Sequence, residues 1–338
     1  MSTLVTGGTG FVGINLVRDL AAAGHEVVSV DVGAPDVLAT AFLAPWAERV
    51  HWVTGDLTDP AVLAAVGRDH RIDRVVHAAA YTPYEDQERT HFRYAFDNNL
   101  TAHLNLIDFV VAHGVARLLF VSTMAVYSPE YFTEPTGHVR YREDEPLDPH
   151  HVYGIGKLAG EALQRRAAHL FGFDAVSVRL AQNWGPMERV TPFHARMSIP
   201  WYWAAQAAAG EPIVASPHGS GVTNGRRLNQ DHPYVLDTAR AVRGLLTAPT
   251  LAHDVYNVSA GDPVFVDDLL AAIRTAVPDV ALADGIEHDD ASRSAAISLD
   301  VTRLTDEIGF VPEFDLASAL AHCVAWRREA GAAVGLAG

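Results

Sequence analysis

The sequence predicts an α/β protein built on a doubly wound parallel sheet, with a smaller C-terminal α/β subdomain. Short β-rich runs alternate with helical patterns from residue 2 to about residue 180, which is typical of a parallel sheet covered by helices. Beyond Gln182-Asn183-Trp184-Gly185-Pro186 the simple alternation is lost, which indicates a change of architecture. At 338 residues, the chain is long enough for two subdomains.

Strands are expected where β-branched and aliphatic residues form short runs. The first five are Ser2–Thr6, Glu26–Val32, Val50–Thr54, Arg74–His77 and Arg117–Val121, and the helical patterns between them include one that ends at about Ala23 and another at about Glu88–His113. A small or polar residue lies at the end of each strand: Gly7, Asp31, Asp56, Ala78 and Thr123. Because ligands of such sheets bind at the carboxyl ends of the strands, these residues are expected to line one site.

A glycine-rich turn follows the first strand. Its sequence is Gly7-Gly8-Thr9-Gly10-Phe11-Val12-Gly13, and strand, glycine turn and helix is the context in which G-x-x-G-x-x-G indicates dinucleotide binding. The glycines permit a tight turn and let the backbone approach a pyrophosphate, which the helix N-terminus would face. Taken alone, the motif could also be a plain β–α turn.

The second strand ends in Asp31, 18 residues beyond Gly13. A carboxylate at this place can bind the adenosine ribose hydroxyls and would repel a 2′-phosphate. The sequence therefore favours NAD over NADP, with a solvated turn residue as the alternative interpretation of Asp31.

The middle and C-terminal parts of the chain are less regular. Glu130–Pro149 is polar and contains proline, which predicts a loop over the site. Later elements are expected at Tyr153–Phe171 (helix), Asp174–Arg179 (strand), Asp237–Thr247 (helix), Val255–Val258 (strand), and as helices within Asp300–Gly309 and Leu316–Glu329. Trp201, Tyr202 and Trp203 suggest a packing patch or, alternatively, a pocket wall, and Gly219–Gly225 suggests a turn or hairpin.

The strongest chemical signal is Tyr153-Gly154-Ile155-Gly156-Lys157. Lys157 is the only lysine, whereas the other 24 of the 25 Lys and Arg side chains are arginine. Residues i and i+4 share one face of a helix, so the ammonium can lie beside the phenol. A nearby cation favours the phenolate and lowers the pKa of the tyrosine, which would let Tyr153 serve as acid or base. An ordinary exposed helix pair is the alternative.

Composition narrows the class further. The net charge of −16 disfavours nucleic acid and an anionic membrane surface as partners. Cys323 is the only cysteine, which rules out an intramolecular disulfide and fits a reducing cytoplasm. No apolar run reaches transmembrane length. The 17 histidines show no metal-binding spacing, so no metal is expected.

Together these motifs resemble the extended short-chain dehydrogenase/reductases, in particular the NAD-dependent epimerase/dehydratase family. The matching positions cover most of the chain: Thr6–Gly13, Asp31, Asp56-Leu57, His77–Ala80, Asn99, Val121–Tyr127, Tyr153–Lys157, Gly185-Pro186 and Tyr256-Asn257-Val258. The expected division is an NAD-binding Rossmann domain over residues 1–180 plus about 228–260, and a substrate-binding subdomain over about 181–227 and 261–330.

The resemblance also implies roles for individual residues. NAD would contact Gly7, Gly10, Phe11, Val12 and Gly13 at its pyrophosphate, Asp31 at the adenosine ribose, Asp56 and Leu57 at the adenine, and Ala78, Ala79, Ala80 and Asn99 at the nicotinamide half. Thr123 and Tyr153 occupy the catalytic Ser/Thr and acid/base positions, and Lys157 would bind the nicotinamide ribose. Substrate contacts are expected from Thr82, Thr123, Gln182, Asn183 and Arg227.

Two departures from the family pattern concern the substrate. Gln182 stands where members that act on nucleotide sugars commonly carry the asparagine of R-x-x-N-V-Y-G-P. The family's phosphate-binding arginine before an aspartate is replaced in Gln230-Asp231-His232, and Arg226 or Arg227 could compensate. Both departures weigh against a nucleoside-diphosphate substrate without excluding one.

Three functions fit these residues. The first expectation is an NAD-dependent epimerase of a sugar or sugar nucleotide that acts by transient oxidation of a secondary alcohol. The alternative is a dehydrogenase of a sugar, sugar acid or other secondary alcohol that releases NADH. The third is a dinucleotide-binding regulator without chemistry, which Thr123, Tyr153 and Lys157 disfavour because a sensor needs no acid or base.

Dehydration is not expected, because Met124 and Ala125 follow Thr123 where the family's dehydratases carry an Asp-Glu pair. Neither side chain can move a proton, although Glu143, Asp144 or Glu145 in the following loop could substitute. By resemblance, the chain is also expected to form a homodimer, through the helices at about 88–113 and 153–171.

Overall fold

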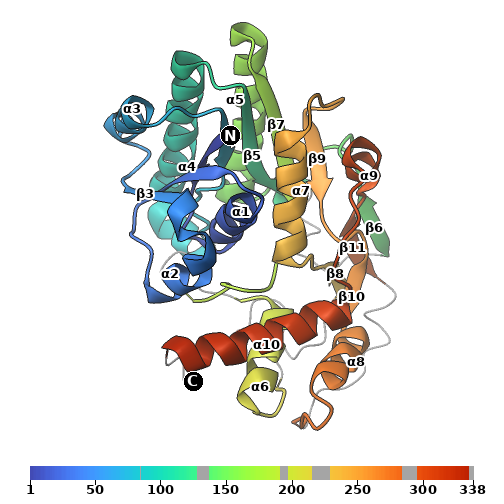
Figure 1. Ribbon diagram of the computed structural model, residues 1–338. Helices are drawn as coiled ribbons and strands as arrows, with labels where there is room; N and C mark the ends of the chain where they lie inside the picture. The colour runs from blue at the N-terminus through green and yellow to red at the C-terminus, as the bar shows by residue number, and fades with distance from the viewer. Residues whose placement is uncertain (84, 128–136, 191–196, 215–228, 284–294, 335–338) are drawn as a thin grey trace.

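The computed structural model describes residues 1–83, 85–127, 137–190, 197–214, 229–283 and 295–334 (Figure 1). Its larger sheet has seven strands, all parallel, in the order β3-β2-β1-β4-β5-β7-β9. Their bounds are β1 Ser2–Thr6, β2 Glu26–Asp31, β3 Val50–Thr54, β4 Arg74–His77, β5 Arg117–Thr123, β7 Asp174–Leu180 and β9 Val255–Val258. The order reverses direction between β1 and β4, which is the doubly wound arrangement predicted from the sequence.

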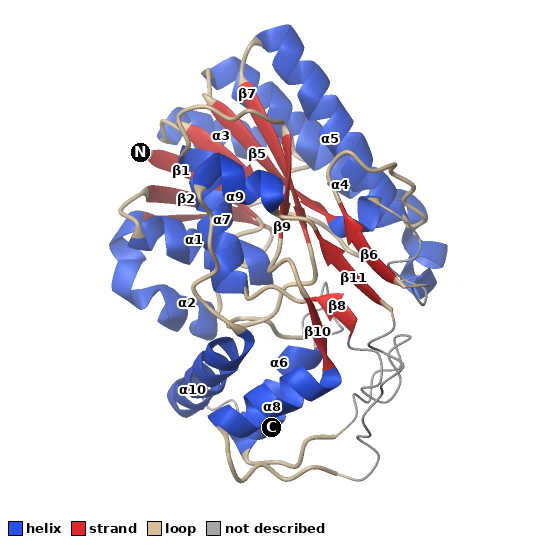
Figure 2. Ribbon diagram, turned by 90° about the vertical axis from the view of Figure 1, so that its right-hand side faces the viewer, coloured by secondary structure: helices blue, strands red, loops and turns tan. Residues whose placement is uncertain are grey.

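Helices cover both faces of this sheet (Figures 1 and 2). Side chains of successive strand residues point to opposite faces, so Val5 packs with α1 and α7 whereas Leu4 packs with α3 and α4. The helices on the first face are α1 (Phe11–Ala22), α2 (Val37–Leu43) and α7 (Val235–Thr247), and those on the second are α3 (Pro60–Asp69), α4 (Glu85–His113) and α5 (Val152–Phe171). Short 3₁₀ turns, η1 (Ala44–Arg49) and η2 (Met124–Val126), follow α2 and β5.

A smaller mixed sheet lies beside the large one, with strand order β10-β8-β11-β6. Strand β11 (Ala296–Leu299) runs parallel to β6 (His138–Tyr141) and β8 (Asn229–Asp231), whereas β10 (Pro263–Phe265) is antiparallel to β8. Helices α6 (Ile199–Ala209), α8 (Val266–Ala276) and α10 (Leu316–Val334) pack together below this sheet, and α9 (Thr302–Ile308) packs near β9 (Figure 1). The smaller C-terminal α/β part predicted from the sequence is confirmed.

One predicted loop is wrong in part. Within the predicted loop Glu130–Pro149, residues 138–141 form strand β6, while residues 128–136 lie outside the described part of the chain. The ring of Tyr141 stacks on Tyr127 at 4.9 Å between centroids, and the strand pairs with β11 more than 150 residues later. Such a distant partner leaves little local signal in the sequence.

The aromatic patch at 201–203 lies in α6. Trp203 is fully buried and donates from Nε1 to the Val214 carbonyl at 3.0 Å, which supports the packing interpretation. The predicted turn at Gly219–Gly225 lies outside the described residues. Across the described ranges, none of the helices is both long and apolar enough to cross a membrane.

Candidate active site at the carboxyl edge of the large sheet

The glycine turn touches the end of the neighbouring strand. Gly7 has a φ of +71°, and a Cβ added there would lie 2.7 Å from the backbone of Ala79. Only glycine fits this position without moving the 78–80 segment. Helix α1 then begins with Gly10 as its N-cap, without a side-chain cap and without an acidic residue in its first turn. The first turn of α1 therefore supplies no carboxylate to its own positive end, which fits a bound pyrophosphate.

Two carboxylates end adjacent strands beside this turn. Asp31 accepts a hydrogen bond from the Thr9 backbone N–H at 2.9 Å, so it holds the glycine turn against β2. Asp56 follows β3 and accepts from both the N–H and the hydroxyl of Thr58, at 2.9 and 2.8 Å. Leu57 is buried. These residues form one wall, at the place where the sequence predicted the adenosine half of a dinucleotide.

The residues predicted beside the nicotinamide lie on the loop after β4, except Asn99, which lies in α4. The backbone of Ala78 and Ala79 passes directly behind Gly7. The Asn99 side chain accepts from the Tyr81 N–H at 2.7 Å and donates to the Tyr81 carbonyl at 2.8 Å. The Asn99 side chain thus fixes the loop by hydrogen bonds to the backbone of Tyr81. Both the oxygen and the nitrogen of the Asn99 amide have protein partners.

Helix α5 brings Tyr153 to the end of β5. A carboxylate from α4, Glu88, accepts from the Val152 N–H at 2.8 Å and so fixes the first turn of α5. A Cβ on Gly154 would lie 2.7 Å from the Ala125 carbonyl oxygen, so glycine is needed for this close approach. The phenol of Tyr153 forms hydrogen bonds with the side chains of Thr123 and Thr82. Three residues predicted from distant parts of the sequence therefore meet here.

Burial dominates the proton affinities of this site. It raises the pKa of Tyr153 to about 12, against hydrogen bonds with Thr123 and Thr82 that lower it. It also lowers the pKa of Lys157 to about 7, an effect that the charge of Glu161 opposes. The predicted lowering of the tyrosine pKa by Lys157 is therefore wrong for the polypeptide by itself, because the loss of water around the phenol outweighs the favourable contacts.

Lys157 is almost fully buried, with 3 % of its surface exposed. Its Nζ donates to the Val121 carbonyl at 2.6 Å and lies 5.7 Å from the centre of the Tyr153 ring and 4.5 Å from that of Phe120. The ammonium is thus held between α5 and β5, beside the phenol, as the i and i+4 spacing predicted.

Sequence reasoning missed the polar groups that surround Lys157. The rings of His77 and His103 stack at 5.2 Å, and burial holds the pKa of His77 well below its usual value and lowers that of His103 to about 3, so both are neutral. Glu161 and Arg179 form a buried ion pair at 2.8 Å. The i+4 spacing of Glu161 after Lys157 was visible in the sequence, but its partner on β7 was not.

The predicted substrate residues differ in how far other protein groups already bind their polar atoms. Thr82 is exposed beside Tyr153. The backbone of Gln182 is hydrogen-bonded to the buried ring of His232, and burial lowers the pKa of His232 to about 4. The Asn183 amide is engaged at both ends, donating to the Ala181 carbonyl at 3.0 Å and accepting from the Thr238 hydroxyl at 2.5 Å. Arg226 and Arg227 lie outside the described residues.

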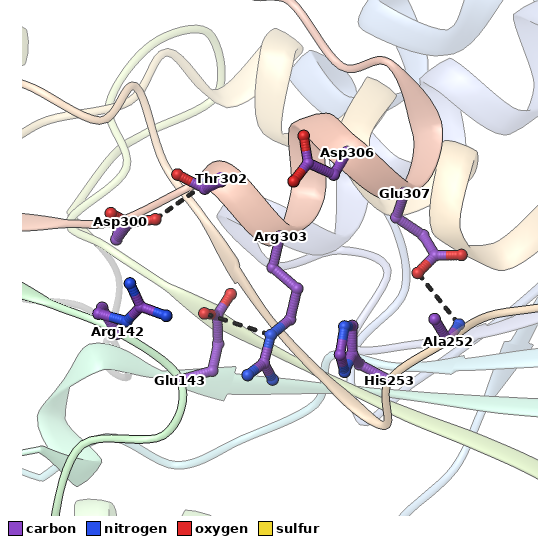
Figure 3. A pocket seen from close by; sticks show the side chains of 9 residues that line it. All are labelled: Arg142, Glu143, Ala252, His253, Asp300, Thr302, Arg303, Asp306 and Glu307. Atoms are coloured by element: carbon purple, nitrogen blue, oxygen red, sulfur yellow. Dashed lines mark hydrogen bonds and ion pairs between the residues drawn. The ribbon is translucent and has the colours of Figure 1, made fainter.

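A separate pocket of about 450 Å³ shows where the carboxylates after Thr123 are placed (Figure 3). The Glu143 side chain points toward Arg303, 3.6 Å away, and accepts from the Asn257 N–H at 2.8 Å. The exposed Asp144 pairs with Arg142 at 3.2 Å. The pocket is lined by Arg142, Glu143, Ala252, His253, Asp300, Thr302, Arg303, Asp306 and Glu307. Thr123 and Thr82, whose side chains are hydrogen-bonded to the Tyr153 phenol, do not line this pocket.

The model of the NAD dependent epimerase/dehydratase family matches residues 3–259. A dTDP-glucose 4,6-dehydratase of Streptomyces griseus is 29% identical over 335 residues, covering 96% of this chain and 93% of that protein. The UDP-glucose 4-epimerase of Thermus thermophilus, solved as a complex with NAD, is 25% identical with a TM-score of 0.72, covering 96% and 98% of the two chains. The UDP-glucose 4-epimerase of Thermotoga maritima, solved with UDP-glucose, has a TM-score of 0.76 at 21% identity, covering 97% and 99%, and supports the fold.

Proposed function

The chain belongs to the NAD-dependent epimerase/dehydratase family, and we propose that it is an NAD-dependent epimerase of a nucleotide sugar. The observation that carries this proposal is the pair that follows Thr123. Met124 and Ala125 are buried in η2 and cannot transfer protons. The site can therefore move a hydride and one hydroxyl proton, which suffices for epimerisation by transient oxidation of a secondary alcohol.

The protein's own groups divide the work of that reaction. The glycine turn, Asp31 and the 78–80 loop would hold NAD, which when bound supplies the hydride acceptor and donor. Tyr153 Oη would take the proton of the substrate hydroxyl and later return it, while Thr123 Oγ1 orients that hydroxyl. The ammonium of Lys157 would favour the phenolate form that burial alone disfavours. Thr82 and Gln182 are proposed to contact the sugar.

Elimination of water needs an acid for the leaving hydroxyl and a base for the adjacent carbon. Two of the three carboxylates that could replace the missing pair are bound elsewhere, because Glu143 binds Asn257 and Arg303, and Asp144 binds Arg142. The third, Glu145, is exposed. This arrangement favours epimerisation over dehydration, although dehydratases are among the relatives.

We propose that the substrate binds in the subdomain formed by residues 181–227 and 261–330. The Rossmann part is formed by residues 1–180 and about 228–260.

A released-cofactor measurement with a turnover assay tests the proposal. Purified protein is denatured and the supernatant is analysed for NAD, and intact enzyme is incubated with UDP-glucose and with dTDP-glucose. The proposal predicts about one NAD per chain and an isomeric product without net NADH. An empty site with accumulation of NADH would support a dehydrogenase instead, and a product that has lost water would support a dehydratase.

A homodimer through α4 and α5 is the second part of the proposal. These two helices pack side by side (Figure 2) and carry exposed apolar residues at seven- to eight-residue spacing, Leu104 and Val111 on α4 and Ile155, Leu163 and Leu170 on α5. Exposed apolar rows of this kind mark protein interfaces. Light scattering at micromolar concentration is expected to report a dimer, and a monomer would contradict this assignment.

A further inference from the structure

The carboxylate of Glu161 lies one helical turn beyond Lys157 on α5 and is 2 % exposed. Its Oε1 accepts from the Ser122 hydroxyl at 2.5 Å and from Arg179 Nε at 3.1 Å, and its Oε2 accepts from Arg179 Nη2 at 2.8 Å. The guanidinium therefore grips the carboxylate with two parallel hydrogen bonds, which fixes both its orientation and its charge. A buried pair of this kind is weak as a source of stability, since desolvation offsets much of its attraction.

The surroundings of Lys157 make Glu161 important for its charge. Strand β5 contributes the Phe120 ring and the Val121 carbonyl, and α5 contributes the Tyr153 phenol. His77 on β4 and His103 on α4 are neutral and supply no negative charge. The carboxylate that favours the charged form of Lys157 is Glu161.

The same carboxylate also holds the end of β5. Ser122 directly precedes Thr123, so its hydrogen bond ties the position of Thr123 to α5, the helix that carries Tyr153. On the far side, Arg179 Nη1 donates to the Tyr127 hydroxyl and to the Glu143 carbonyl, each at 3.1 Å. These two hydrogen bonds hold the Arg179 guanidinium in place, so its orientation toward the Glu161 carboxylate is fixed.

We propose that Glu161 is a positioning residue for the reaction: its negative charge, oriented by Arg179 and Ser122, keeps the buried Lys157 ammonium protonated beside Tyr153. This inference rests on the proposed function for its consequence in turnover, but its physical content is a property of Lys157 that is measured without substrate. Residues i and i+4 of a helix have Cβ atoms about 5–6 Å apart, and an opposite charge within about 4–6 Å shifts a pKa by about 1–3 units.

The sole lysine of the chain makes a direct test possible. Protein labelled with ¹³C at lysine Cε gives one side-chain lysine signal, that of Lys157, whose shift is followed against pH in samples of equal NAD content. Glu161→Gln is expected to lower the titration midpoint of Lys157 by at least about one unit, whereas Glu161→Asp retains most of the wild-type midpoint. An unchanged midpoint in folded Glu161→Gln protein overturns the proposal.

A second variant covers the case in which Glu161→Gln leaves Arg179 unpaired and the protein fails to fold. Glu161→Gln combined with Arg179→Met removes both charges, which buried pairs often tolerate. The double variant is expected to fold with a lowered Lys157 midpoint, and a wild-type midpoint in it would show that Glu161 is merely structural. Asp174→Asn is the matched control, because it removes a carboxylate that binds Arg117 at the opposite end of β7, and the midpoint is expected to stay unchanged.

Turnover supplies a readout that a structural role would not move. A lower Lys157 midpoint leaves less ammonium at alkaline pH, so Glu161→Gln is expected to lose about five- to tenfold more turnover at pH 8 than at pH 6. A loss equal at both values contradicts a role through Lys157. If the wild type turns over no nucleotide sugar, the proposed function fails while the titration still decides the inference about Glu161.

Discussion

The two ends of strands β5 and β7 each carry a buried arginine, but the two arginines are partnered differently. At the amino end, Arg117 donates at 2.6 Å to Asp174, whose side chain is 44% exposed. The rest of its guanidinium binds carbonyl oxygens near the end of α7, those of Leu245, Leu246 and Ala248. At the carboxyl end, Arg179 and its partner Glu161 are both inaccessible to water and lie beside a second buried cation, Lys157.

The contrast indicates different roles for the two ends of this strand pair. The amino-end cluster serves stability, and the carboxyl-end cluster serves function. The amino-end cluster balances its charge, because Arg117 pairs with Asp174, whose carboxylate reaches solvent. The carboxyl-end cluster holds one positive charge more than it needs for pairing. An unpaired buried charge is unfavourable, so its presence at the ligand-binding edge of the sheet indicates that it serves the chemistry there.

The strongest test of this contrast is Tyr153→Phe, which removes the acid/base while leaving the ring. Turnover is expected to fall by ~10²–10⁴-fold with little change in unfolding temperature or NAD binding. Tyr256→Phe is the control, because that hydroxyl binds Glu307 at 2.7 Å in the separate pocket. Steady-state kinetics check both variants, and turnover within a few-fold of wild type in Tyr153→Phe removes this residue from the mechanism.

Lys157→Met should abolish turnover yet stabilise the fold. The pKa of Lys157 is lowered by burial to about 7, so in the unfolded chain the group binds a proton more tightly than in the native one. The resulting penalty is fully present below about pH 7 and disappears as pH rises toward the unfolded pKa of about 10.5. We expect a gain on the order of a few kcal/mol at pH 6, reduced by the lost bond to Val121.

Urea unfolding at pH 6 and pH 9.5 measures this gain. The difference between Lys157→Met and wild type should be larger at pH 6 than at pH 9.5. A variant that is less stable than wild type at pH 6, or a difference that does not depend on pH, would show that the burial of Lys157 carries no electrostatic penalty.

At the amino end of β5, Arg117→Met should destabilise the fold and leave turnover nearly unchanged. It leaves three carbonyl groups without their donor, and we expect a loss of about 2 kcal/mol in the free energy of unfolding. Turnover per folded molecule should stay within about twofold, since the cluster lies at the edge of the sheet opposite the candidate site. A large fall in kcat at a temperature where the variant is fully folded would erase the distinction between the two ends.

The smallest effect is expected at Asp31, which ends strand β2 on the other side of β1 and β4. Asn at this position keeps an acceptor for the Thr9 N–H but removes the charge, so the glycine turn should remain in place. The ratio of NADP to NAD dissociation constants should fall by about tenfold. Asp56→Asn serves as the comparison, because its loss of charge should change the affinity for both cofactors alike, and equal binding of NAD and NADP by the wild type would place Asp31 away from the ribose.

Contacts between residues close together in the sequence could be predicted, whereas contacts between residues far apart in the sequence could not. The placement of Asp31 at a strand end and of Lys157 beside Tyr153 followed from spacing, since a strand end or one helical turn fixes it. The partners that define the buried clusters come from residues far apart: Ser122 and Glu161 are 39 apart, and Arg117 and Leu245 are 128 apart. Strand β6 was missed for the same reason, and the pKa of Tyr153 was mispredicted because burial cannot be read from a local pattern.

The most direct test of the proposed reaction is turnover of UDP-glucose in deuterated water, followed by mass spectrometry and NMR of the product. Met124 and Ala125 after Thr123 cannot exchange a carbon-bound proton, and in the proposed reaction the hydride returns to the sugar it left. The predicted product is an isomer of the substrate with unchanged mass and no deuterium on carbon. A product that has lost water and gained carbon-bound deuterium would contradict this, and would mean that another carboxylate supplies the acid and base of a dehydratase.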